Sequence, residues 1–248
     1  MEPAEAATTS PRSTRPSRRR RVAVVACAAL LLYLVVAYVV LPVAWRRYTR
    51  RHRGLEDVPG VTHTKDGIPG DPLNVALVGS EAEVKGILRA AGWNAADPLG
   101  LRSDLEIAEA TVLRRSYDDA PVSNLYLFGR KEDLAFEQPV GGDPRKRHHV
   151  RFWRAEKTDA DGRLVWVGSA TYDERVGLSR TTGQVTHHIA PDVDAERDHL
   201  MLTLNGTGEI AEVYYVDDFH KIREGKNGGG DPWRTDGRLA VGVIAPPR

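Results

Sequence analysis

The longest apolar stretch of the chain covers residues 22–41, VAVVACAALLLYLVVAYVVL, and contains no charged residue over twenty positions. About 20 apolar residues in a helix suffice to cross the hydrocarbon core of a bilayer. Trp45 lies where an interfacial aromatic side chain is expected. We therefore expect a transmembrane helix over residues 22–45, preceded by a disordered basic tail at residues 1–21. The alternative is a cleaved signal peptide, which normally has a shorter apolar region and a small-x-small cleavage site.

Beyond this run, residues 46–71 are basic and then rich in glycine and proline. Such a composition predicts a linker, so the folded domain is expected over residues 72–248. Short apolar or alternating runs bounded by turn residues predict strands. These strands are expected at residues 73–79, 122–129, 134–137, 148–157, 163–173, 210–219 and 236–244, with a hairpin over 178–189. The Asp161-Gly162 pair predicts a hairpin turn between the strands 148–157 and 163–173. The glycine-rich stretch GKNGGGDPW at residues 225–233 is expected to be a flexible loop.

Capping patterns and apolar residues at helical spacing predict three helices in the domain. The helices are expected between Ser80 and Gly92, from Ser103 to about Arg115, and from about Asp194 to Leu204. No internal repeat and no second change of composition divides residues 72–248. We therefore predict a single α+β domain with a mostly antiparallel sheet and about three helices, preceded by one transmembrane helix.

The charges are divided unevenly along the chain. Residues 1–53 carry eleven arginines and two glutamates, a net charge of +9, and the remainder carries −8, which together give the formal +1 of the chain. An acidic domain argues against nucleic-acid binding, which depends on positive charge. The arginines that flank the apolar run can pair with anionic lipid headgroups, so membrane lipids are the expected partners. Six arginines before the run against five after it favour an N-terminus inside and an extracytoplasmic domain.

Alternation along RKRHHVRFW, residues 145–153, provides the first candidate site. Side chains of a strand alternate between its two faces, so His148, Val150 and Phe152 should face the core. The opposite face would then carry a set of cationic, imidazole and aromatic groups suited to an anion or a flat polar ligand. With an even-length hairpin loop, this set comprises Arg147, His149, Arg151, Trp153 and Trp166. The alternative is a structural sheet face on which Arg151 stacks on a tryptophan.

The stretch THHIAPDVDAERDHL, residues 186–200, provides the second candidate site. Histidine and carboxylate ligands suit Zn²⁺, Mn²⁺ or Fe²⁺, which makes His188 and Asp194 candidate metal ligands. No HExxH pattern is present. The alternative is a capped helix without a metal, in which Asp194 is the N-cap. For catalysis, a histidine beside a carboxylate is the minimal requirement. The candidate catalytic residues are His149, Asp173, His187 and Asp192.

Several stretches, taken in order, resemble the LssY C-terminal domain family of bacterial proteins. They are DPLNVALVGS, AAGW, APVSNLYLFGRKEDLAFE, RHHVRFW, GRLVWVGSATYD, THHIAPDVDAERD and TDGRL, and they cover about residues 71–244. Similar domains often follow membrane-embedded modules, so the resemblance implies a role close to a membrane. It implies no established activity, cofactor or protein partner.

Two functions therefore remain open from the sequence. The first is a binding or accessory module at the membrane or cell envelope, presented by a single-pass anchor. The second is a hydrolase, with or without a metal, that acts on an anionic envelope or lipid-derived substrate. The enzyme requires a histidine within hydrogen-bond reach of a carboxylate in a pocket, whereas the binding module requires only a cationic, aromatic-lined surface.

Overall fold

The computed structural model describes residues 18–52, 54–55, 57–96, 125–141, 146–181, 183 and 185–246. The chain divides into two compact units, Met1–Tyr48 and Thr49–Arg248. The helix predicted over residues 103–115 lies outside the described residues. In the second unit, the described residues form an α+β fold with mixed but mostly antiparallel sheets, as the sequence predicts.

The described residues of the first unit lie in one long helix, which is formed by α1 (Arg18–Val35), the π-helical turn η1 (Val36–Val40) and α2 (Leu41–His52) and ends four residues beyond the unit boundary at Tyr48. It begins inside the segment predicted to be a disordered tail. The N–H of Leu41 donates to the carbonyl of Val36, five residues back. In a regular α-helix the ring of Pro42 would clash with the carbonyl of Tyr38, and the wider π turn lies where that clash would arise.

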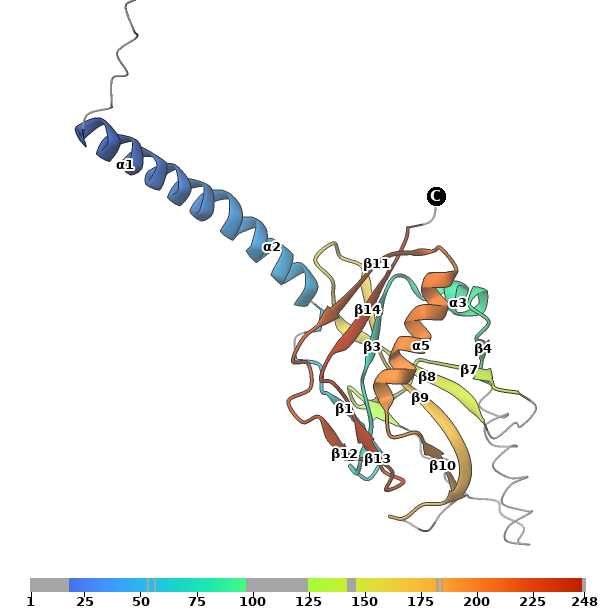
Figure 1. Cartoon of the computed structure of the whole chain (residues 1–248). Coiled ribbons are helices and arrows are strands. Elements are labelled where there is room, and N and C mark those ends of the chain that lie inside the picture. The colour runs from blue at the N-terminus through green and yellow to red at the C-terminus, as the bar shows by residue number, and fades with distance from the viewer. Residues whose placement is uncertain are drawn as a thin grey trace, which may run out of the picture. The chain divides into compact units, whose positions relative to one another are not determined.

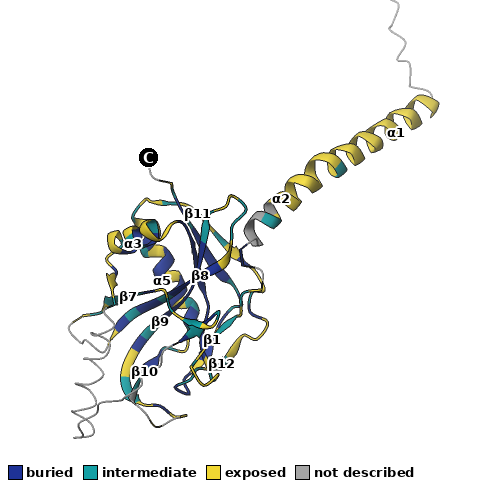
Figure 2. Ribbon diagram, turned by 180° about the vertical axis from the view of Figure 1, so that it is seen from behind, coloured by how far each residue is buried: buried dark blue, intermediate teal, exposed yellow. Residues whose placement is uncertain are grey.

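This helix has the length and composition needed to cross a bilayer. The candidate span covers Arg18–Arg46, 29 residues, and none of its most apolar window is buried. In Figure 2 most of the described part of this helix is yellow, the colour of exposed residues. An apolar helix near the N-terminus is also what a signal sequence would show.

The second unit is built on an eight-stranded sheet among the described residues. The strand order is β11–β14–β3–β9–β8–β7–β4, with β10 paired to β9. The bounds are β3 (Val75–Val78), β4 (Asn94–Ala95), β7 (Leu134–Pro139), β8 (Arg147–Thr158), β9 (Leu164–Leu178), β10 (Val185–Ile189), β11 (Ile210–Val216) and β14 (Leu239–Ile244). Among these pairs, β14 and β3 are parallel and the others are antiparallel.

The long hairpin β8–β9 forms the centre of this sheet. Its turn is closed by the N–H of Gly162, which donates to the carbonyl of Asp159 and has a φ of 79°. Glycine adopts this left-handed conformation without steric cost, which confirms the predicted turn. The far end of β9 pairs with β10, where Leu178 lies opposite Val185, so the hairpin predicted over residues 178–189 is confirmed.

A smaller sheet in the order β2–β1–β5–β6 includes part of the predicted linker. Its strands are β1 (Val61–His63), β2 (Pro69–Pro72), β5 (Tyr126–Leu127) and β6 (Arg130–Lys131). The segment 46–71 therefore contributes β1 and β2 to the fold. At Gly70 an added Cβ would lie 2.5 Å from Thr62 and 2.6 Å from Leu125. Gly70 thus allows close packing, which composition alone does not distinguish from a linker.

The glycine-rich stretch after residue 224 is an ordered hairpin, where the sequence predicts a flexible loop. Its strands are β12 (Glu224–Lys226) and β13 (Pro232–Arg234). The side-chain oxygen of Asn227 accepts hydrogen bonds from the N–H groups of Gly229, at 3.0 Å, and Asp231, at 2.9 Å. These bonds satisfy backbone N–H groups of the turn, so the glycine-rich stretch forms a defined hairpin.

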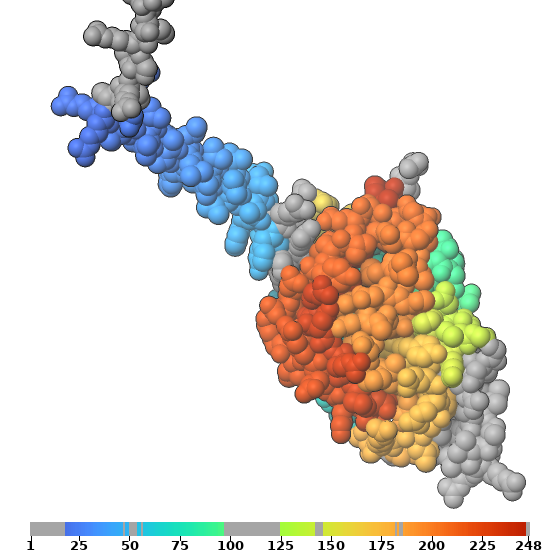
Figure 3. Space-filling model, viewed as in Figure 1, coloured from blue at the N-terminus to red at the C-terminus, as the bar shows by residue number. Residues whose placement is uncertain are grey.

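Alternation in the central strands produces two apolar cores, one on each face of the large sheet. The core beside the helices contains Val75, Leu77, Ile87, Phe136, Val150, Phe152, Trp166, Leu200 and Leu204 among others. The core on the opposite face contains Leu55, Leu73, Ala76, Val78, Leu125, Leu127, Trp153, Val165 and Val167 among others. Figure 1 shows α5 lying across the helix side, and in Figure 3 the segments after about residue 185 cover most of the visible face of the domain.

Two capped helices cover the first of these faces. The capping box of α3 (Glu81–Ala90) is confirmed, since Ser80 and Glu83 exchange side-chain and backbone hydrogen bonds. The N-cap of α5 (Val193–Gly206) is Asp192, whose carboxylate accepts from the N–H of residue 195 at 3.3 Å. The prediction that Asp194 is the N-cap is therefore wrong.

Candidate functional site

The pleat of β8 places three basic side chains on the face opposite the helices. In the register of the central hairpin, Arg147 lies opposite Asp173, His149 opposite Thr171, and Arg151 opposite Ser169. Residues opposite each other in a sheet share a face. We use the name polar layer for five of these residues, Arg147, His149, Arg151, Ser169 and Asp173, together with Asp71 of β2 and His187 of β10.

Arg147 is the most densely paired member of the polar layer. It is 3% exposed, and its Nε donates to Asp173 Oδ2 at 3.2 Å. One terminal nitrogen donates to Glu137 Oε2 at 2.9 Å, and the other contacts His187 Nε2 at 3.0 Å. Because arginine can only donate, His187 accepts through Nε2. All three guanidinium nitrogens of Arg147 therefore contact groups within the domain, which compensates for the burial of its charge.

Arg151 is held less closely than Arg147. Its nearest carboxylates are Asp71, 3.8 Å from Nη1, and Glu132, 4.0 Å from Nε, both beyond normal hydrogen-bond length. Among the described residues, the buried Nε has no hydrogen-bond partner, and neither does His149 Nε2 or the hydroxyl of Ser169. Buried polar atoms in native proteins are nearly always satisfied, so these three atoms are candidates for a contact with water or with a polar group from outside the chain.

Burial perturbs the acid–base chemistry of this layer. It raises the pKa of Asp173 and of Asp71, against the opposing effect of the nearby guanidinium groups. Burial also holds the pKa of His149 well below its ordinary value, and the positive charges of Arg151 and Arg147 add to the effect. The imidazole of His149 is therefore neutral at pH 7. Groups perturbed by burial together with specific charges are typical of functional sites.

Five residues proposed from the sequence come together here: Arg147, His149, Arg151, Asp173 and His187. The tryptophans do not join them. Trp153 lies in the apolar core of this face, and its indole N–H donates to the carbonyl of Arg130 at 3.3 Å. Trp166 lies in the helix-side core, so the prediction that it shares a face with Arg151 is wrong. The reason is the hairpin loop of residues 159–163, whose odd length exchanges the faces of β9 relative to β8.

The candidates from the second stretch have other partners. His188 is 3% exposed, and its Nδ1 lies 2.6 Å from Asp231 Oδ1 of the β12–β13 hairpin. Asp194 accepts from the hydroxyl of Thr235 and pairs with Arg197, so His188 and Asp194 are engaged by different elements. Besides capping α5, Asp192 pairs with Arg234 at 3.0 Å on the surface.

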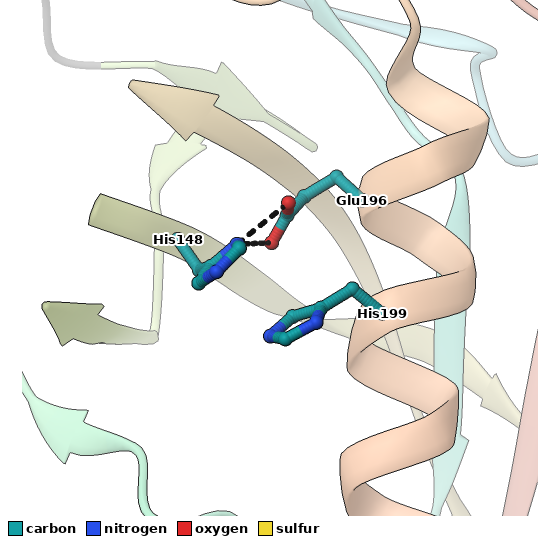
Figure 4. Close-up of side chains that lie close together, drawn as sticks. All are labelled: His148, Glu196 and His199. Carbon is teal, nitrogen blue, oxygen red and sulfur yellow. Dashed lines mark hydrogen bonds and ion pairs between the residues drawn. The ribbon is translucent and has the colours of Figure 1, made fainter. Parts of the chain in front are cut away.

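A second cluster, on the helix side of the sheet, was not identified from the sequence. His148, Glu196 and His199 each offer a metal-ligating atom, and these atoms lie within 4.8 Å of one another. Figure 4 shows His148 reaching from β8 toward the two side chains of α5. The spacing of Glu196 and His199, three residues apart in a helix, places them on one face and is the signal that could have found this pair.

Comparison with known proteins identifies the family of the domain. The model of the family described as LssY C-terminus matches residues 55–239. The comparisons with curated proteins and with solved structures give no match. The matched range begins at Leu55, the first residue of the core opposite the helices, and therefore includes β1 and β2. It spans well over half of the 248 residues and confirms the resemblance found in the sequence. The chain belongs to the LssY C-terminus family.

Proposed function

We propose that this protein is a single-pass membrane protein whose LssY C-terminus domain binds an anionic group in the polar layer. The observation that supports this most is a set of three buried atoms that have no hydrogen-bond partner among the described residues: the Nε of Arg151, the Nε2 of His149 and the hydroxyl oxygen of Ser169. All three can donate a hydrogen bond, and they come from facing positions of β8 and β9. A phosphate or carboxylate oxygen is the partner that such donors lack.

The charge of the layer is compatible with an added anion. Arg147 is neutralised by Asp173 and Glu137, whereas the contacts of Arg151 with carboxylates are long. The pKa of Asp71 is raised by burial, so protonation of this carboxyl costs less than that of a free aspartate and would remove the negative charge closest to Arg151. The bound anion would then be stabilised by a guanidinium in a site shielded from water, where charged hydrogen bonds are strong.

The long N-terminal helix supports the membrane part of the proposal. Its span of 29 residues exceeds the roughly 20 that a bilayer requires, and arginines flank it on both sides. The domain is proposed to lie on the extracytoplasmic side, because six arginines precede the apolar run and five follow it. Carbonate extraction of membranes should leave the full chain in the pellet, and added protease should digest the domain on intact cells. A mature chain without its first forty residues, found in the aqueous fraction, would contradict the anchor.

The binding site is tested by calorimetric titration of the detergent-solubilised full chain. The probes are inorganic phosphate, acetate and a short-chain phosphatidic acid, which separate a free anion from a lipid headgroup. A hydrogen bond to a charged group contributes about 1.5–3 kcal/mol, so Arg151→Gln should weaken binding roughly 10- to 100-fold. Arg154→Gln is the matched control, because Arg154 lies three residues along the same strand and is exposed. Equal affinity in the two variants, or no binding by the wild type, would refute the proposal.

A hydrolase is the second candidate, favoured by the 3.5 Å separation of His187 Nδ1 and Asp173 Oδ2. A carboxylate beside an imidazole can orient it as a general base. The base atom would be Nε2, but Nε2 accepts from Arg147, and this is why binding is the first proposal. Turnover of p-nitrophenyl phosphate or acetate, abolished by Asp173→Asn, would establish the hydrolase. Absence of turnover in a chain that binds phosphate would exclude it for these substrates.

A further inference from the structure

The cluster on the helix side of the sheet has the composition of a metal site. His148 comes from β8, and Glu196 and His199 come from the first turns of α5. The carboxylate oxygens of Glu196 lie 2.8 and 3.0 Å from His148 Nδ1, and the two imidazole rings stack with centroids 3.8 Å apart. Two histidines and one carboxylate form the ligand set of many catalytic zinc sites and of non-heme iron sites.

The separation of His148 and Glu196 agrees with a shared ion, and the three ligand atoms together lie within 4.8 Å of one another. Ligand atoms bound to one metal at about 2.0–2.2 Å are separated from each other by about 3 Å in tetrahedral or octahedral geometry. The contact between Glu196 and His148 Nδ1 has this length already. In the metal-free form it is a hydrogen bond, and an entering cation would replace its proton, as metal binding to imidazole generally requires.

The side chain of Gln138 determines which ring nitrogen of His199 carries the proton. Its Nε2 lies 2.9 Å from the side-chain oxygen of Gln138 on β7. Because an amide oxygen can only accept, Nε2 carries the proton and Nδ1 keeps its lone pair. Hydrogen bonds of this kind orient histidine ligands in metal sites.

The cluster is fixed on its inner side and open on its outer side. The side chain of Glu196 is 5% exposed and that of His148 is 19% exposed, so solvent reaches the rings. The ring of Trp93 packs against both histidines, with its centroid 6.2 Å from that of His148 and 6.1 Å from that of His199. Its indole N–H donates to the hydroxyl of Thr203. A site held by buried neighbours and reachable from solvent can load a metal without unfolding of the domain.

We propose that His148, Glu196 and His199 bind one divalent first-row transition metal ion, Zn²⁺ or a close substitute. The site is separate from the polar layer, because His148 and His149 point to opposite faces of the sheet. Three protein ligands leave at least one position for water. The ordinary alternative is that Glu196 and His148 form only an ion pair that fastens α5 to β8.

The test uses the full chain in detergent, treated with a chelator and titrated with Co²⁺. One equivalent should produce visible d–d absorption, and Zn²⁺ should abolish it. His199→Ala and Glu196→Gln should each lose at least tenfold in Co²⁺ affinity while far-UV circular dichroism is unchanged. His63→Ala, which removes an exposed histidine of β1, should bind as the wild type does.

The outcomes separate the metal site from an ion pair and from the proposed anion site. No absorption in the wild type, or equal Co²⁺ affinity in the wild type and both cluster variants, would overturn the proposal. Glu196→Gln is included because it preserves the shape of the side chain if His199→Ala disturbs the fold. Phosphate binding should be the same in Glu196→Gln as in the wild type, so failure of one proposal leaves the other to be judged separately.

Discussion

His148 and His149 are neighbours on one strand, but the sheet places them in different surroundings. His148 lies beneath α5, is partly exposed, and contacts Glu196 and the ring of His199. His149 is 4% exposed and lies among charged residues of the polar layer, and its Nε2 has no hydrogen-bond partner in the part of the chain that the structure describes. The helix side thus offers ligands to a cation, whereas the opposite side offers donors to an anion. A one-residue step along a strand is enough to separate the two chemistries.

The largest effect is expected from breaking the polar layer at its most buried charge. Arg147→Met leaves Asp173 buried without its main partner, and removing one member of a buried pair costs about 3–5 kcal/mol. Arg234→Met is the control, because the pair of Arg234 with Asp192 is exposed and such pairs contribute at most about 1 kcal/mol. Denaturant unfolding measures both. Similar losses in the two variants would mean that the layer is no more important to stability than the surface.

A pH series tests the burial of His149. Its folded-state pKa is below the ordinary 6.5, so between these two values only the unfolded chain binds the proton. Stability is therefore full above pH 6.5 and falls as the pH drops through that window, by at most about 1.4 kcal/mol per pH unit for one proton.

The matched variants compare a buried with an exposed histidine. His149→Asn should lose less free energy of unfolding between pH 7 and 5 than the wild type, while His63→Asn, on the exposed side of β1, should follow the wild type. The buried carboxyls Asp71 and Asp173 act in the opposite direction, since their pKa values are raised, but they are present in all three chains. Identical slopes would show that His149 is accessible to protons in the folded state.

The smallest expected effect concerns Asp71 and the proposed anion. Sulfate keeps its charge between pH 5 and 8, so its affinity reports the protein groups alone. Binding should tighten as the pH falls through the raised pKa of Asp71. Asp71→Asn should bind sulfate a few times more tightly at pH 7.5 and with less pH dependence, whereas Asp66→Asn, on an exposed turn, should match the wild type. Weaker binding by Asp71→Asn would place the anion elsewhere.

Alternation within one strand was sufficient to predict much of the polar layer. Arg147, His149 and Arg151 share a face because every second residue of a strand does. The faces of the partner strand β9 were harder to predict, because they depend on whether the hairpin loop has an even or an odd number of residues. The loop 159–163 has an odd number, so Trp166 lies in the helix-side core. Capping and turn signals are local, which explains why α3 and the turn at Gly162 were predicted correctly.

Contacts between distant segments were beyond the reach of these patterns. Asp71 belongs to a segment whose glycine and proline content predicts a linker, and only its pairing in β2 brings it near Arg151. Likewise, nothing local to His148 indicates that α5 will cross β8 at Glu196 and His199. Packing of a helix on a sheet is set by the whole core, so such clusters emerge only from the folded chain.

The central claim, that the unpartnered groups of the polar layer receive an anion, is tested most directly by nitrogen NMR of histidine side chains. The full chain is labelled at histidine, and the Nε2 signal of His149 is assigned by its loss in His149→Asn. Addition of phosphate should shift this signal in a saturable way while that of His63 stays in place. A His149 signal that remains unchanged at saturating phosphate would contradict the account.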